Sequence, residues 1–181
     1  MNADIEKAVL YQREVRKLIE GLPYQAIAEM AEALAPYRDS GGIDWVAGNG
    51  GSAANASHCV LHLDDVGILG RCLTDNTPIL TARSNDIDYR EALAAQLHYA
   101  KPDDAILVFS GSGVSKNIVN LLEAAVNMGI KARLGIFGFA GRDAPAPKYC
   151  PTKIVLNSTN YGAIEDVHSM IIHILKEMLT D

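Results

Sequence analysis

Two segments rich in glycine and serine carry the residue types of a phosphate-binding site. The first is GNGGSAANASH at residues 48–58, and the second is FSGSGVSKN at residues 109–117. Glycine lets the backbone approach a ligand closely, and the first turn of a helix offers unpaired N–H groups with a partial positive charge. Serine hydroxyls add hydrogen-bond donors for an anion. Together the two segments favour a cradle for a phosphate group.

A segment of this composition can also be a simple turn with a helix cap. For residues 48–58 alone, the turn-and-cap interpretation has the same weight as phosphate binding, with Ser52 as a possible N-cap. The second segment presents three hydroxyls within six positions, from Ser110, Ser112 and Ser115. Neither segment has the ending of a Walker loop or the spacing of a dinucleotide-binding fingerprint. The pairing of the two segments favours phosphate binding over a purely structural role.

The elements that must position these segments alternate between strands and helices. Strands are expected at residues 43–48, 104–113 (running into the second segment), 131–139 and 152–158. Helices are expected at residues 3–20, 24–37, 52–66, 77–86, 88–100, 114–129 and 160–179, and a loop with three prolines at 141–151. This order predicts a doubly wound α/β fold with a mostly parallel sheet and two extra N-terminal helices, and the sheet is expected to have five strands although only four strand segments are visible in the sequence. Ligands of such sheets collect at the carboxyl ends of the strands, where both segments lie.

Composition excludes several other classes of protein. The 181 residues fit one domain, and the net charge of −6 without a dense basic block argues against nucleic-acid binding. Apolar runs stay far below the roughly 20 residues that span a bilayer, and the N-terminus lacks a signal-peptide core. Cys59, Cys72 and Cys150 form neither a disulfide framework nor a CxxC pattern. We therefore expect a cytoplasmic protein with reduced thiols.

With the segment IEDVHSMIIHIL at residues 164–175, these motifs make the chain similar to the sugar isomerase (SIS) family, in particular its phosphoheptose isomerase branch. The resemblance covers about residues 5–180. It implies a single SIS domain over residues 1–181 and a homotetramer with residues 1–38 in the subunit interface. It also implies aldose–ketose isomerisation of a sugar phosphate, such as sedoheptulose 7-phosphate, through an enediolate. The implied substrate contacts are Asn49, Gly50, Ser52, Asn76, Ser110, Gly111, Ser112 and Ser115.

The chain departs from the family pattern at the reacting end of the site. His62 stands where the family has a glutamate, Glu165 where it has a glutamine, and Ala163 where it has an arginine. Asn76 replaces an aspartate. The phosphate cradle is therefore retained while the groups near the reacting carbons are changed, which leaves open an isomerase of another sugar phosphate.

Isomerisation needs a base that removes a carbon-bound proton and a group that stabilises the enediolate. The alignment with the family selects Glu165 as the base, with His173 as the partner acid and His62 also at the reacting end. Helix geometry offers an alternative, because Asp166 and His173 are seven residues apart and nearly eclipsed.

The resemblance also implies a metal site formed by His58, His62, Glu165 and His173. Three imidazoles and a carboxylate suit a divalent ion, with zinc the first candidate. A metal-free site whose four side chains bond to one another and to the substrate is the alternative. Tight binding of all four ligands would compete with a role of Glu165 as a free base. A non-catalytic SIS protein that binds a phosphosugar or another protein is a further alternative.

Overall fold

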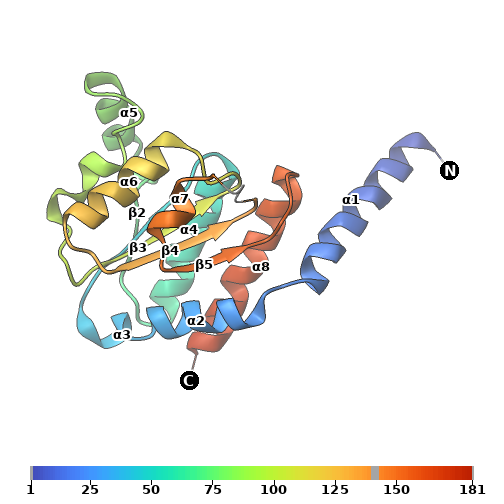
Figure 1. The fold of residues 1–181 in the computed structure, drawn as a ribbon, viewed down its shortest axis with the longest axis horizontal. Coiled ribbons are helices and arrows are strands. Elements are labelled where there is room, and N and C mark those ends of the chain that lie inside the picture. The colour runs from blue at the N-terminus through green and yellow to red at the C-terminus, as the bar shows by residue number, and fades with distance from the viewer. Residues whose placement is uncertain (1, 140–142, 181) are drawn as a thin grey trace.

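The computed structural model describes residues 2–139 and 143–180, and its centre is a five-stranded parallel sheet (Figure 1). The strands follow the order β2 (Gly70–Cys72), β1 (Asp44–Ala47), β3 (Ala105–Ser110), β4 (Ala132–Phe137) and β5 (Thr152–Val155). Each pair of neighbours runs in parallel. β3 is buried along its whole length, as expected of a central parallel strand with the apolar sequence AILVFS. The predicted fold class is confirmed.

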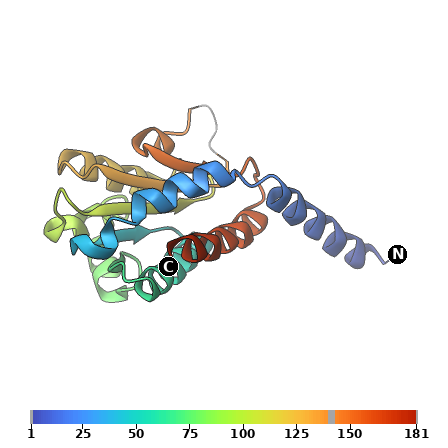
Figure 2. The ribbon, with the colours of Figure 1, turned by 90° about the horizontal axis from the view of Figure 1, so that it is seen from below.

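Helices cover both faces of the sheet (Figure 2). They are α1 (Ala3–Glu20), α2 (Tyr24–Leu34), α3 (Tyr37–Ser40), α4 (Gly51–Asp65), α5 (Thr77–Asp86), α6 (Lys116–Asn127), α7 (Ala146–Tyr149) and α8 (Tyr161–Leu179), with a 3₁₀ helix, η1 (Ala94–Tyr99). Side chains alternate along the strands, so Val46 and Leu107 pack toward α2, α4 and α8. Trp45 and Ile106 pack toward α6, α7 and η1 on the other face.

Both glycine and serine segments follow strands at the point where the strand order reverses. The chain leaves β1 to form β2 on one side of it, and then forms β3 on the other side. In a sheet of this order, the crevice between the carboxyl ends of β1 and β3 is the expected ligand site. Residues 48–51 follow β1 and residues 111–115 follow β3, so the topology brings the two segments to this crevice.

Several local expectations were wrong. Gly50, not Ser52, is the N-cap of α4, and no side chain caps this helix. Residues 88–100 do not form an α-helix: the Asp88 carboxylate accepts a hydrogen bond from the Arg90 amide, and this local turn competes with a helical start. Only η1 follows. The expected loop at 141–151 contains the single turn α7, while residues 141 and 142 lie outside the described part of the chain.

The fifth strand, β2, falls in a stretch where no strand segment was expected. It has only three residues, and just one of them is buried. Such a short edge strand carries no hydrophobic pattern that a sequence could reveal.

Helix α1 projects from the body of the molecule (Figures 1 and 2). None of its residues is buried, although Val15, Leu18 and Ile19 at its C-terminal end pack against the core. Nearer the middle of α1, the Tyr11 hydroxyl donates a 2.5 Å hydrogen bond to the Asp166 carboxylate of α8, which raises the pKa of Tyr11 to about 12. The apolar side chains of Ile5 and Leu10 remain more than half exposed.

Asp44 of β1 is fully buried, and neither carboxylate oxygen has a hydrogen-bond partner among the described residues. Burial, together with the nearby charge of Asp104, raises the pKa of Asp44 to about 7. The unfolded chain ionises near pH 4, so the folded state is stabilised below that pH and loses stability as pH rises toward 7.

We therefore expect Asp44→Asn to flatten this pH dependence and to raise the free energy of unfolding at pH 8 by roughly 2–4 kcal/mol. Urea denaturation at pH 4, 6 and 8 measures the effect. The control is Asp103→Asn, because Asp103 is exposed and next to Asp104. A wild-type protein whose stability is the same at pH 4 and pH 8 would show that Asp44 does not titrate in this range.

Candidate active site

A small cavity of about 70 Å³, which we call the loop pocket, lies at the crevice between β1 and β3. Both glycine and serine segments contribute to it, and so does the first turn of α8. Its lining residues are Asn49, Ser52, Phe109, Ser110, Gly111, Ser112, Ser115, Tyr161 and Glu165. All of the expected substrate contacts except Gly50 and Asn76 therefore line one pocket, and Gly50 lies within the first loop.

Residues 110–115, which we call the serine loop, are held in place by hydrogen bonds within the loop and to the segment after β4. The Ser110 hydroxyl accepts a hydrogen bond from the Gly113 amide at 3.0 Å, and Gly113 has a positive φ of 68°. The Phe139 amide, from the segment after β4, donates to the Gly111 carbonyl at 2.7 Å. Ser115 is the N-cap of α6 and its side chain makes no capping hydrogen bond. Its hydroxyl and the first amides of α6 can therefore serve a bound anion.

Asn49 is fixed by residues that sequence reasoning missed. Its side chain exchanges two hydrogen bonds with the Asn117 amide of α6, at 2.9 and 2.7 Å. The Tyr89 hydroxyl also donates to the Asn49 side-chain oxygen at 2.7 Å. Asn117 lies within the quoted serine motif, but its pairing with Asn49 spans 68 positions and has no local signal. This network joins the two loops and orients one amide toward the pocket.

Glu165 and Asp166, the two candidate bases, point to different places. The Glu165 side chain lines the loop pocket and lies so close to Gly51 that a methyl group there would collide with the carboxylate. Asp166 instead accepts the hydrogen bond from Tyr11 of α1. Asn55 of α4 donates to the Glu165 carbonyl at 3.0 Å and so ties α8 to α4. The geometry therefore favours Glu165 over Asp166 as the candidate base in the loop pocket.

Tyr161 is a further residue of the pocket that was not selected from the sequence. Its ring packs against Gly111, where any side chain would collide with it. Although it lines the pocket, the side chain is more than half exposed. Tyr161 thus forms part of the outer wall of the cavity, next to the serine loop.

Three histidines meet between α4 and α8. The Nε2 atom of His58 lies 3.0 Å from Nε2 of His173 and 3.2 Å from Nε2 of His62. The three ring centroids are 4.5 to 5.2 Å apart, with each pair of rings edge to face. His58 and His62 lie one turn apart on α4, and the packing of α8 against α4 adds His173.

This histidine cluster fits a divalent metal ion. Ligand nitrogens about 2.0–2.1 Å from a tetrahedral zinc ion lie about 3.3 Å from one another, close to the two Nε2 separations. Burial and the neighbouring imidazoles lower the pKa of His58, which favours the neutral form that binds metal. The three histidines form a group that could hold an ion, whereas Glu165, the fourth expected ligand, lies in the loop pocket.

A carboxylate lies behind the cluster, as is common for metal-binding histidines. An Asp65 oxygen is 3.5 Å from Nδ1 of His62, on the side of the ring opposite Nε2. The same oxygen accepts a 2.6 Å bond from the Lys176 ammonium of α8, which lowers the pKa of Asp65. Nδ1 of His62 is buried and makes no hydrogen bond among the described residues, so the Asp65 carboxylate is the nearest group that can accept its proton and orient the ring.

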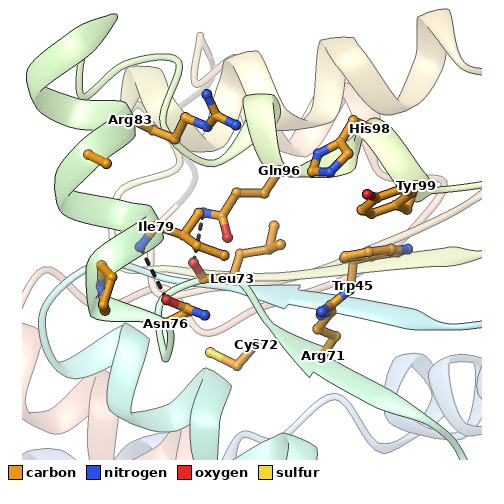
Figure 3. A pocket seen from close by; sticks show the side chains of 12 residues that line it. Trp45, Arg71, Cys72, Leu73, Asn76, Ile79, Arg83, Gln96, His98 and Tyr99 are labelled. Atoms are coloured by element: carbon orange, nitrogen blue, oxygen red, sulfur yellow. Dashed lines mark hydrogen bonds between the residues drawn. The ribbon is translucent and has the colours of Figure 1, made fainter.

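Asn76, expected to contact the sugar, lies apart from the loop pocket. Its side-chain oxygen accepts a hydrogen bond from the Ile79 amide at 3.1 Å and so caps α5 (Figure 3). It lines a different cavity, next to Arg71 and Cys72. In this conformation Asn76 serves the start of a helix and not the serine cradle.

A serine-lined pocket at the switch point of a parallel sheet, with a carboxylate beside it, is the arrangement expected of an α/β domain that binds a phosphorylated ligand. Residues 10–132 match the family model described as the SIS domain. The chain belongs to the SIS domain family.

Curated relatives and a solved structure agree with this assignment. A phosphoheptose isomerase of Rhodospirillum rubrum is 31% identical over 86% of this chain and 85% of its own length. One from Geotalea daltonii is 33% identical, covering 84% and 82% of the two chains. The structure of a phosphoheptose isomerase from Francisella tularensis superimposes with a TM-score of 0.84 at 25% identity, over 99% and 98% of the two chains. The predicted branch and class of enzyme, a sugar-phosphate isomerase, are confirmed.

Proposed function

We propose that this chain catalyses the aldose–ketose isomerisation of a sugar phosphate, with a seven-carbon sugar phosphate as the first candidate. The observation that carries the proposal is the Glu165 carboxylate lining the same pocket as the three serines of the phosphate loop. A base held at a phosphate cradle is what proton transfer on a phosphorylated sugar requires. The relatives named phosphoheptose isomerase support the choice of substrate.

Different residues of the loop pocket bind the phosphate, bind the sugar and transfer the proton. Ser110, Ser112 and Ser115 bind the phosphate, together with amides at the start of α6. Asn49, held by Asn117 and Tyr89, hydrogen-bonds a sugar hydroxyl. The Glu165 carboxylate removes a proton from the hydroxyl-bearing carbon next to the carbonyl and returns it to the former carbonyl carbon, while a second proton passes from that hydroxyl oxygen to the former carbonyl oxygen. Fixing the phosphate end of the substrate places the reacting carbons near this carboxylate.

The histidine cluster supports the binding of a metal ion, in addition to the base Glu165. His58, His62 and His173 would hold it, with Asp65 orienting His62. Zinc is the ion best suited to three imidazoles, and when bound it supplies Lewis acidity for a substrate carbonyl and the developing negative charge. Because Glu165 lies in the loop pocket, it stays free to act as a base. His173 acts as a ligand in this arrangement, in place of the partner acid first expected.

An isomerisation assay over five-, six- and seven-carbon ketose and aldose phosphates tests the function and identifies the substrate. Conversion of one pair well above the others supports an isomerase. Saturable binding of a sugar phosphate without conversion, in metal-loaded protein, would instead support the non-catalytic alternative. Sugar phosphates are charged metabolites of the cytoplasm, where the three free cysteines would remain reduced. Among the described helices, none is both long and apolar enough to cross a membrane.

The serine loop gives a direct prediction for binding. Ser112→Ala is expected to weaken sugar-phosphate binding by about 1–3 kcal/mol, because a hydrogen bond to a charged acceptor is lost. Isothermal titration calorimetry with the substrate from the assay measures the change. Ser57→Ala is the matched control, since Ser57 bonds to Asp75 outside the pocket. Equal affinity of the Ser112→Ala and wild-type proteins would remove the serine cradle from the proposal.

The exposed apolar side chains of α1 support assembly into a homo-oligomer, with a tetramer of dihedral symmetry proposed from the family. Leu10→Glu is expected to shift the protein to a smaller species in light scattering, because a charge would be buried in the interface. Lys7→Glu is the control, as Lys7 already lies in a highly exposed ion pair with Asp4. A wild-type protein that is monomeric at micromolar concentration would refute the interface.

A further inference from the structure

A second cavity, which we call the edge cavity, lies where β2, α5 and η1 meet (Figure 3). Its volume is about 510 Å³, and it shares no lining residue with the loop pocket. Cavities of roughly 300–1,000 Å³ are the usual size for small-molecule ligands. The proposed isomerase mechanism makes no use of this space.

The charge of the edge cavity is opposite to that of the protein. Arg71, Arg83 and His98 line it, and no aspartate or glutamate is among its described lining residues. The whole chain has 22 acidic and 16 basic residues, so a cavity without an acid is a local departure from its composition. Two guanidinium groups without a lining carboxylate favour an anionic ligand, and a phosphate most of all.

The walls of the edge cavity suit a flat ring. Trp45 is almost fully buried and forms the floor on the sheet side, where the Arg71 guanidinium lies over its ring, 5.4 Å from the ring centre. Tyr99 and Ile79 face the space from η1 and α5 (Figure 3), and they are 70% and 39% exposed. Large apolar side chains that remain exposed around a cavity gain from covering by a ligand with an aromatic body.

Polar groups inside the edge cavity can recognise the edge of a heterocycle. Gln96 is almost fully buried, and its amide nitrogen donates to the Leu73 and Ala92 carbonyls at 2.9 and 3.0 Å. These two bonds fix the amide so that its oxygen is directed into the cavity (Figure 3). A preset acceptor within an apolar wall selects a ligand with an N–H donor.

We propose that the edge cavity binds a nucleoside phosphate. The base lies against the aromatic and aliphatic wall and donates to the Gln96 oxygen. The phosphate oxygens pair with the guanidinium groups of Arg71 and Arg83. A nucleoside phosphate is the ligand class that matches the positive charge, the aromatic and aliphatic walls and the Gln96 acceptor together.

Trp45 is the single tryptophan of the chain, so its fluorescence reports directly on the edge cavity. We would titrate the wild-type protein with ADP, GDP, UDP and CDP, with the parent nucleosides, and with inorganic phosphate, and repeat each positive titration by calorimetry. At least one diphosphate is expected to bind saturably below about 1 mM. Its nucleoside and inorganic phosphate are expected to bind at least 10-fold more weakly.

Arg71→Ala and Arg83→Ala are each expected to weaken nucleotide binding about 10-fold or more, while Arg16→Ala on α1 leaves it unchanged. Ser112→Ala should also bind the nucleotide as the wild type does, because Ser112 lies in the other pocket. Loss of binding in Ser112→Ala would place the nucleotide in the serine loop and overturn the proposal. So would equal affinity in both arginine variants, if circular dichroism shows them folded, or the absence of any saturable signal with all four nucleotides.

Discussion

Replacing Glu165 with glutamine is expected to lower kcat for the isomerisation by about 10²–10⁴-fold, with little change in KM. The amide keeps the shape of the side chain beside Gly51 but cannot accept a proton from carbon. Substrate binding should survive, since the serine loop that we propose holds the phosphate is unchanged in this variant. Steady-state kinetics with the substrate found in the assay, on protein of unchanged thermal stability, measures both constants.

Asp166→Asn is the matched control for this prediction. Asp166 is the next residue on α8, but its carboxylate bonds to Tyr11 of α1. Its amide variant is therefore expected to keep kcat within a few-fold of the wild type. If Asp166→Asn lost activity and Glu165→Gln did not, the base would be Asp166 and the orientation of this turn of α8 would differ in the active enzyme.

Removal of the second imidazole of α4, that of His62, is expected to weaken metal binding strongly. His62→Ala should bind zinc at least about 10²-fold more weakly than the wild type and lose activity in parallel, because two nitrogen ligands replace three. Asp65→Asn should give a smaller loss of affinity, roughly 10–100-fold, since it acts on the orientation of His62. Elemental analysis of protein purified without chelator, followed by zinc competition titrations, measures these changes.

His98→Ala provides the control for the metal experiment. His98 lines the edge cavity, away from the histidine cluster, so its loss should leave the zinc content unchanged. Full activity of metal-free wild-type protein in excess EDTA would contradict the metal proposal. The isomerisation would then depend on Glu165 and the hydrogen bonds of the loop pocket alone.

Local patterns in the sequence determined the main outline of this protein. The strand and helix alternation predicted the α/β fold, because apolar periodicity is a property of short segments. The two glycine and serine segments predicted the two loops that line the loop pocket, since glycine at a positive φ and serine near a helix start act within a few residues. The spacing of His58 and His62 placed both on one face of α4, as helical geometry requires.

Tertiary structure decided how the candidate groups are divided. Glu165 and His173 lie eight residues, or about 12 Å, apart along α8, so one side chain can line the loop pocket while the other joins the histidine cluster. Only the packing of α8 on α4 brings His173 to the histidine cluster and Glu165 to Gly51. The pairing of Asn49 with Asn117 and Tyr89, and the edge cavity itself, also join elements far apart in the chain. Spacing along a sequence cannot reveal such contacts, because they depend on how helices and loops pack across a completed sheet.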